Sequence, residues 1–327
     1  MKTRGIVKEI YTRVKNIDFL PLLFAYFIMV VFFSITSQYF FSVRNFMNIA
    51  LYAAIVGILA CSTTLVIAAG KIDFAAGSVI ALGSCIMGIM MRDGYSVWAA
   101  IGACMAVSIL VGALDGFLIA YVGINQFIAT LASMQMFRGF AYIITNALSI
   151  SIMHPVLKFI GRDFAFGTIP NAVILTLIIA VIFVFLANKT TLGRKFFVIG
   201  GNERVAFLSG INVKFSILIL YVIHGAVTGI AAILWTAQLG AALPSAAPNL
   251  NFQAISATVL GGVSLTGGKG SIVGALVGAL LLGTLNNGMV MLDIQSFWQD
   301  VIIGFVLIFA VTLDIIKNKR ASMVRNK

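Results

Sequence analysis

The chain has 327 residues, of which 61% are hydrophobic and only 10% are charged, and its formal net charge is +12. A soluble domain carries roughly 25% charged residues and a disordered chain is poor in hydrophobic ones, so this composition excludes both classes. The long continuous apolar runs approach the roughly 20 residues of a membrane helix and differ from the alternating segments of a transmembrane β-barrel. The composition therefore predicts an all-α integral membrane protein.

In chain order, the apolar runs predict about ten membrane helices, some of them short or broken. Their expected ranges are Phe19–Ser37, Asn48–Ala69, Phe74–Met91, Val97–Val122, Phe127–Leu148, Asn171–Ala187, Phe215–Leu239, Phe252–Val263, Ser271–Leu292 and Phe297–Ile316. The first run is too long for the apolar core of a signal peptide, so we interpret it as a membrane helix. Ten crossings would place both termini on the same side of the membrane.

The positive charge is concentrated in three places, since 15 of the 22 Lys and Arg residues lie within 1–18, 189–214 and 317–327. Basic residues beside membrane helices mark the cytoplasmic side, and ten crossings put all three clusters on one side. We therefore expect a basic cytoplasmic N-terminus at 1–18, a transmembrane domain at 19–316 with a cytoplasmic loop at 190–213, and a basic cytoplasmic C-terminus at 317–327. This distribution indicates contact with membrane lipid and no nucleic-acid partner.

Two glycine-rich segments interrupt the apolar runs. We expect breaks in the helices at Gly70, Gly77, Gly261, Gly262, Gly267, Gly268 and Gly270. Unwound backbone within a membrane protein is tolerated where it lines a cavity or is buried in protein. Each break leads into Gly-Ser and a helix rich in small residues, which suggests an internal repeat. Small residues that serve ordinary helix packing would produce the same likeness, so that alternative stays open.

No grouping of residues is typical of an enzyme or a metal site. The sequence has neither a P-loop nor a hydrolase-type Ser, His and Asp spacing. His224 lies in an apolar run without an acidic residue at helical spacing, which favours a packing or pore-lining histidine. The cysteines Cys61, Cys85 and Cys104 also lie in apolar runs, so we expect them to be packing residues.

Polar residues inside apolar runs are candidates for a transport pathway, because they are costly in lipid. The candidates are Lys71, Asp73, Asp115, Gln126, Thr130, Arg138, Asn286 and Asn287. Lys71 and Asp73 are close enough in sequence to pair with one another. For Asp115, Arg138 and Asp300, a structural pair or a side chain reaching toward the membrane surface is the alternative interpretation.

The cytoplasmic loop is the most informative polar segment. Asn202 is expected to cap a short helix that has Glu203 in its first turn and ends at Gly210. This helix would expose Ala206, Phe207 and Leu208. Exposed apolar side chains indicate a docking surface for another protein, and an amphipathic helix on the membrane surface is the alternative.

Several segments, in the same order along the chain, resemble the permeases of ABC importers of the ribose, galactose and autoinducer-2 class. The matching segments are Leu192-Gly193-Arg194, Gly200-Gly201-Asn202 and Ser209-Gly210-Ile211 in the loop, Gly70–Ser78, Phe127–Leu131 with Arg138-Gly139, Val259–Gly262 with Gly267–Gly270, and Asn286-Asn287-Gly288. The sequence departs from the family pattern at Lys71, where glycine is usual, at Phe74-Ala75, and at Asp115, where a neutral polar residue is common.

The resemblance implies a non-enzymatic subunit of an ATP-driven importer in the bacterial inner membrane. Two permease chains would form the pathway, and an extracytoplasmic binding protein would deliver a monosaccharide or similar small polar solute. Cytoplasmic ATPases would hold ATP and Mg²⁺, so this chain would bind no cofactor itself. They would dock on Gly193, Arg194, Gly200, Gly201, Asn202, Glu203, Ala206, Phe207 and Gly210.

One alternative function is a secondary transporter driven by an ion gradient, with Asp73 and Asp115 as ion ligands. The small number of acidic residues in the apolar runs and the apparent docking loop favour the ATP-driven importer.

Overall fold

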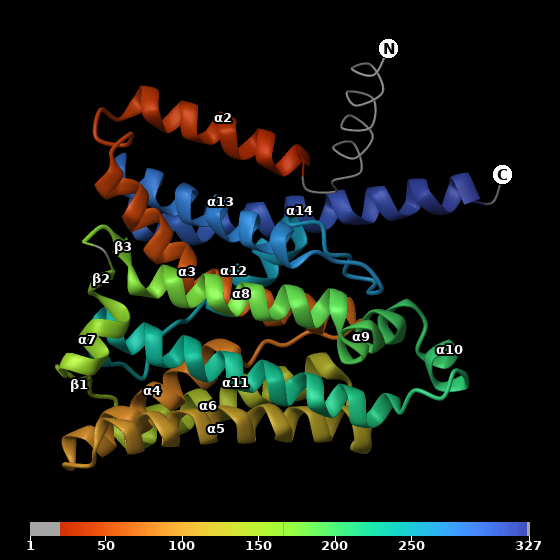
Figure 1. The fold of residues 1–327 in the computed structure, drawn as a ribbon, viewed down its shortest axis with the longest axis horizontal. Coiled ribbons are helices and arrows are strands. Elements are labelled where there is room, and N and C mark those ends of the chain that lie inside the picture. The colour runs from red at the N-terminus through yellow and green to blue at the C-terminus, as the bar shows by residue number, and fades with distance from the viewer. Residues whose placement is uncertain (1–19, 166, 326–327) are drawn as a thin grey trace.

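The computed structural model describes residues 20–165 and 167–325, and it is mostly helical (Figure 1). The first half contains α2 (Leu20–Thr36), α3 (Val43–Ala68), α4 (Ala76–Arg92), α5 (Val97–Phe117), the π-helical turn η1 (Leu118–Val122), α6 (Gln126–Thr145) and α7 (Pro155–Gly161). The second half contains α8 (Asn171–Lys189), α9 (Thr191–Gly201), α10 (Glu203–Leu208), α11 (Val213–Leu239), α12 (Leu250–Leu260), α13 (Ile272–Met291) and α14 (Ser296–Arg325). Two short antiparallel pairs, β1 (Ile150–Ser151) with β4 (Ala241–Ala242) and β2 (Phe164–Ala165) with β3 (Ile169–Pro170), complete the fold.

The all-α membrane architecture agrees with the sequence prediction. Within the described residues, six helices are long and apolar enough to cross a membrane: α3, α5 continued by η1, α6, α8, α11 and α13. Shorter apolar helices occupy the four other expected positions, at Pro21–Thr36, Ala76–Arg92, Leu250–Leu260 and Phe297–Phe309. The count of ten crossings and the internal repeat therefore stay predictions.

The long helices run side by side, and the molecule has two distinct ends (Figure 1). We call the end that holds α9 and α10 the inner end, and the end that holds α7 and the short strands the outer end. The basic residues between 189 and 214 lie at the inner end, where the positive-inside rule expects the cytoplasm. The basic N-terminus predicted at 1–18 lies outside the described residues.

The core is built around α3 and α11. The apolar window of α3 is 83% buried, and α3 packs against α8, α11, α12 and α13, which explains why it is apolar on all sides. Small residues bring α11 and α5 together. A Cβ added to Gly112 would lie 2.4 Å from Tyr221 O, and one added to Gly225 would lie 2.5 Å from Ser108 O. These two helices therefore meet backbone to backbone.

Both predicted breaks are non-helical, over residues 69–75 and 261–271. Gly70, Gly262, Gly267 and Gly268 have φ angles between +71° and +89°, which glycine adopts without steric cost. The prediction of a break at Gly77 is wrong, because Gly77 lies in the first turn of α4. It is a close-packing residue, since its Cβ would lie 2.5 Å from Ala247 O.

Candidate functional site

The loop predicted to dock a partner forms two helices. Thr190 caps α9, because its hydroxyl accepts a hydrogen bond from Gly193 N at 3.0 Å. Asn202 caps α10 by accepting from Val205 N at 3.0 Å, and Gly210 follows the helix at a φ of +81°. The predicted cap and stop of α10 are confirmed. Helix α9 was not predicted from the sequence. Its buried residues Gly193, Phe196 and Ile199 recur every three positions, as in an amphipathic helix.

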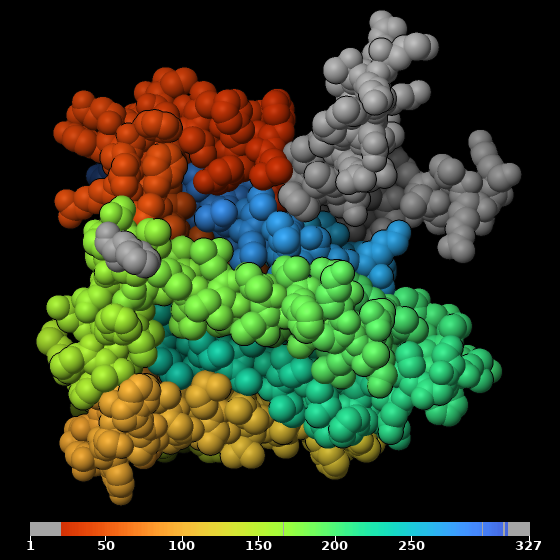
Figure 2. Space-filling model, in the orientation of Figure 1, coloured from red at the N-terminus to blue at the C-terminus, as the bar shows by residue number. Residues whose placement is uncertain are grey.

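Helix α10 presents an apolar surface at the inner end. Val205 is 52% exposed, Phe207 69% and Leu208 75%. Figure 2 shows the green α9 and α10 segment standing out at the edge of the molecule opposite α7. The predicted exposure of Ala206 is wrong, because α10 packs this face against α9 and α11 and buries the methyl group completely. The exposed apolar residues are therefore Val205, Phe207 and Leu208.

A groove of about 780 Å³ lies beside this surface, between α10, η1 and the start of α11. It is lined by Lys71, Ile119, Ala120, Glu203, Arg204, Phe207, Gly210, Ile211, Asn212, Val213, Lys214 and Ile217. Phe207 thus stands at the edge of a concave surface that carries both charged and apolar side chains. Such a combination is typical of a protein interface with an apolar centre and a polar rim.

Four glycines at the inner end bring α9 into backbone contact with both breaks. We call Gly70, Gly200, Gly267 and Gly268, together with Ala68, the glycine junction. Gly268 N donates a hydrogen bond to Ala68 O at 2.8 Å. A Cβ added to Gly200 would lie 1.8 Å from Ala68 O and 2.8 Å from Gly268 N, and one added to Gly267 would lie 2.7 Å from Gly200 O. Movement of α9 must therefore displace both breaks.

Side chains connect the first break to its neighbours as well. Lys71 Nζ lies 3.2 Å from Glu203 Oε2, in the first turn of α10. The local pair predicted between Lys71 and Asp73 is therefore wrong. Gln126 Nε2, at the start of α6, donates to Gly70 O at 3.3 Å. The break is thus held by α10 on one side and by α6 on another.

Asp73 lies in a buried polar cluster, which we define as Ser62, Asp73, Asp115, Ser133 and His224. Asp73 Oδ2 lies 3.2 Å from His224 Nε2, at ion-pair distance but without hydrogen-bond alignment, while His224 Nδ1 lies 2.9 Å from Ser62 Oγ. Ser133 donates a hydrogen bond to Asp115, whose carboxylate lies near enough to Asp73 for the two like charges to repel each other. Asp73 and His224 therefore connect the first break to α11 and, through Ser62, to α3, while Ser133 and Asp115 connect α6 to α5.

The remaining pathway candidates do not converge on this cluster. Thr130 is buried and its hydroxyl donates to Gln126 O within α6. Arg138 Nη1 donates to Pro244 O at 2.9 Å and Ala246 O at 2.6 Å, which supports its structural interpretation. Asn286 Nδ2 donates to Gln299 Oε1 at 2.9 Å and so connects α13 to α14. Asn287 has a buried Oδ1 without a partner among the described residues.

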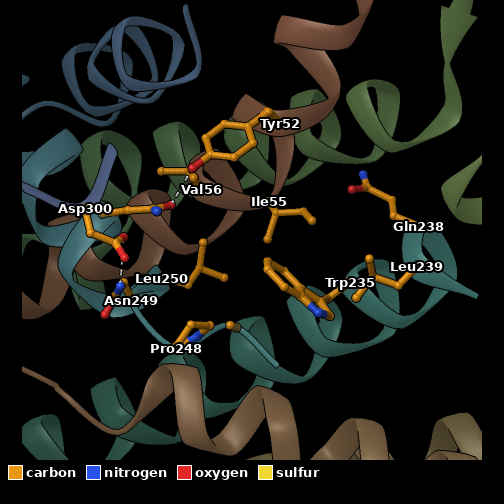
Figure 3. Close-up of a pocket in the computed structure, with 12 residues that line it drawn as sticks. Tyr52, Ile55, Val56, Trp235, Gln238, Leu239, Pro248, Asn249, Leu250 and Asp300 are labelled. Atoms are coloured by element: carbon orange, nitrogen blue, oxygen red, sulfur yellow. Dashed lines mark hydrogen bonds between the residues drawn. The ribbon is translucent and has the colours of Figure 1, made fainter. Parts of the chain in front are cut away.

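A cavity of about 270 Å³, which we call the outer pocket, lies between α3, α11, α12 and the start of α14 (Figure 3). It is lined by Tyr52, Ile55, Val56, Trp235, Gln238, Leu239, Ala247, Pro248, Asn249, Leu250, Gln253 and Asp300. Of these residues, sequence analysis had singled out Asp300 alone. The others lie in two distant stretches of the chain, within 52–56 and 235–253, so no local pattern marks them as a group.

The described residues contain no group of three His, Cys, Asp or Glu side chains that could hold a metal ion. Cys61, Cys85 and Cys104 are buried free thiols.

Comparison with known proteins gives a consistent family assignment. The profile of the family described as branched-chain amino acid transport system / permease component matches residues 45–311. The chain is 37% identical over 290 residues to the ribose import permease protein of Bacillus subtilis (strain 168), covering 88% of this chain and 90% of that protein. It is 35% identical over 290 residues to the D-allose transport system permease protein of Escherichia coli (strain K12), covering 88% of each. No solved structure matches the chain.

Proposed function

Because this chain belongs to the family of branched-chain amino acid transport system permease components, we propose that it is the membrane-spanning subunit of an ATP-driven ABC importer. Its cargo is a monosaccharide or a similar small polar solute, since the relatives of 35–37% identity are permeases named for ribose and D-allose. An extracytoplasmic binding protein delivers the solute, and a cytoplasmic ATPase supplies the energy. A second permease chain completes the pathway in the inner membrane, and both termini face the cytoplasm.

The observation that carries this proposal is the connection of α10 to both helix breaks. Val205, Phe207 and Leu208 offer an apolar docking surface, and burial of one phenylalanine is worth roughly 1.5–3 kcal/mol. The neighbouring α9 packs on both breaks through the glycine junction. A partner that binds α10 differently in its ATP-bound and ATP-free states would thereby bias the breaks between two arrangements.

The polar cluster favours a second candidate, an ion-gradient-driven transporter. Asp73 and Asp115 are buried carboxylates that interact with one another, and buried acids are typical of ion-coupled carriers. Each of them already has a protein partner, His224 for Asp73 and Ser133 for Asp115. This arrangement supports a structural role for both acids. The ATP-driven importer also gives the exposed apolar surface of α10 a function, as the docking site of the ATPase.

The test is uptake into proteoliposomes that contain the chain together with a Walker-A ATPase and a secreted binding protein, which are to be sought in reading frames next to its own. The substrates are D-ribose, D-allose and L-arabinose, the last because a further relative, 36% identical over 275 residues, is named for L-arabinose transport. Leucine is included because of the family description. We expect sugar uptake that requires ATP and the binding protein and continues when ionophores collapse the ion gradients. Uptake that is independent of ATP and abolished by ionophores would instead establish the secondary transporter.

A further inference from the structure

The outer pocket combines aromatic walls with unused hydrogen-bonding groups. Tyr52 of α3 and Trp235 of α11 line it, with Ile55 between them in the view of Figure 3. Asp300 and Gln238 lie on opposite sides of the same cavity (Figure 3). Aromatic side chains offer apolar faces for contact, and the amides and the carboxylate offer directional polar contacts.

The polar groups of the pocket are satisfied only in part within the described residues. Tyr52 donates to Gln253 Oε1 at 3.2 Å, which leaves the NH₂ group of Gln253 for another partner. Asn249 Nδ2 donates to Asp300 Oδ1 at 3.0 Å, which leaves Asn249 Oδ1 and Asp300 Oδ2 as acceptors. The Gln238 side chain makes one hydrogen bond, in which Nε2 donates to Leu51 O at 3.5 Å. The pocket thus has both donors and acceptors to offer, and a hydroxyl group needs both.

The position of the pocket favours an aqueous opening. Asp300 is exposed at the start of α14, and the cost of several kcal/mol for a carboxylate facing hydrocarbon favours contact with water there. Tyr52 precedes Ala68 of the glycine junction by 16 residues of α3, or about 24 Å at roughly 1.5 Å per residue. The outer pocket is therefore separate from the inner end and from the docking surface.

The charge of the lining selects among possible solutes. The lining includes one carboxylate, Asp300, and no lysine or arginine. A sugar acid, a sugar phosphate or the carboxylate of an amino acid would meet repulsion without a compensating cation. A volume of about 270 Å³ lies just below the roughly 300–1,000 Å³ of most small-molecule sites, which suits one small ring.

We propose that the outer pocket is a solute subsite for a neutral polyol of monosaccharide size. One face of the solute packs on Tyr52 and Trp235, and its hydroxyl groups bond to Asn249, Gln253 and Asp300. This inference rests on the proposed function, because it presumes that the chain carries such a solute. It adds that the permease itself rejects anionic solutes at its outer end.

Cysteine protection tests the subsite without ATP or the binding protein. Leu239 lines the pocket and is 45% exposed, so Leu239→Cys in the purified complex is labelled by a water-soluble maleimide, while the three natural cysteines are buried. We expect D-ribose, D-allose or L-arabinose to slow labelling at least fivefold and gluconate to leave it unchanged. In the same background, Gln253→Ala should require about tenfold more sugar for equal protection, and Asp300→Asn should let gluconate protect.

Asp293→Asn is the matched control, because Asp293 is an exposed carboxylate near the start of α14 that does not line the pocket. It should leave protection unchanged. Equal protection by sugars and gluconate in the unmodified pocket, or none by any sugar, would overturn the subsite. Uptake measured on the same preparation keeps the two proposals apart. Protection without ATP-driven uptake would support the subsite and contradict the importer. ATP-driven uptake without protection would support the importer and contradict the subsite.

Discussion

The two ends of the molecule are packed in opposite ways. At the glycine junction, the backbones of α9 and both breaks touch so closely that a Cβ on Gly200 would lie 1.8 Å from Ala68 O. In the outer pocket, long side chains from four helices leave about 270 Å³ unfilled. A contact without free volume passes displacement from one segment to the next, whereas a lined cavity can receive a solute. The comparison assigns coupling to the inner end and solute contact to the outer end.

Because the glycine junction has no free volume and the outer pocket does, added atoms should impair the junction more than the pocket. The largest effect is expected for Gly200→Ala, because the added methyl group cannot fit against Ala68 without moving α9. Alanine is intrinsically better than glycine in a helix by about 1 kcal/mol, so any loss must come from the junction, where overpacking costs about 1–3 kcal/mol. We expect ATP-driven sugar uptake to fall at least tenfold while the amount of inserted protein stays near normal.

Gly102→Ala provides the matched control for this change, because it is the same substitution within a helix, at a position outside the docking loop. A Cβ added to Gly102 of α5 would meet no atom within 4 Å, so uptake should stay within twofold of the unmodified protein. Equal uptake by the Gly200 and Gly102 variants would show that the close contact at Gly200 is not required.

The next largest effect is expected at the docking surface. Phe207→Asp replaces a 69% exposed aromatic side chain by a charge and should weaken ATPase binding by about ten- to a hundredfold, the equivalent of roughly 1.5–3 kcal/mol. The measurement is retention of the ATPase on the purified permease, together with uptake. Phe207→Leu keeps an apolar side chain and should retain most of the binding. Normal ATPase retention by Phe207→Asp would favour the alternative in which α10 lies on the membrane surface.

The smallest effect is expected for the ion pair between Lys71 and Glu203. The Lys71 side chain is 16% exposed and the Glu203 side chain 57%, so water screens the pair from the Glu203 side, and pairs that water screens contribute about 0–1 kcal/mol. Lys71→Glu or Glu203→Lys alone should lower uptake by about two- to fivefold through like-charge repulsion, and the double reversal should restore it. Failure of the double variant to recover would mean that the two side chains act separately.

The sequence was informative where local chemistry decides the structure. Continuous apolar runs predicted the helix positions, and the Asn202 cap and the Gly210 stop were correct because each depends on residues within one turn. Contacts between distant segments could not be predicted. His224 finds its acidic partner in the break at Asp73, and Lys71 pairs with Glu203 across 132 positions. The interpretation of Ala206 failed for the same reason, since the missed α9 is part of what covers it.

The most direct test of the central claim measures whether α10 and the second break move as one unit. Spin labels at Ser209→Cys, directly after α10, and Lys269→Cys are both at exposed positions of the inner end and measure the distance across the junction. A label at Met153→Cys, which is 85% exposed near β1, pairs with each of them to measure the distance between the inner and outer ends. With one labelled permease copy in the complex, ATP binding should change the Ser209–Met153 distance and leave the Ser209–Lys269 distance constant. A change in the Ser209–Lys269 distance with a constant Lys269–Met153 distance would contradict coupling through the glycine junction.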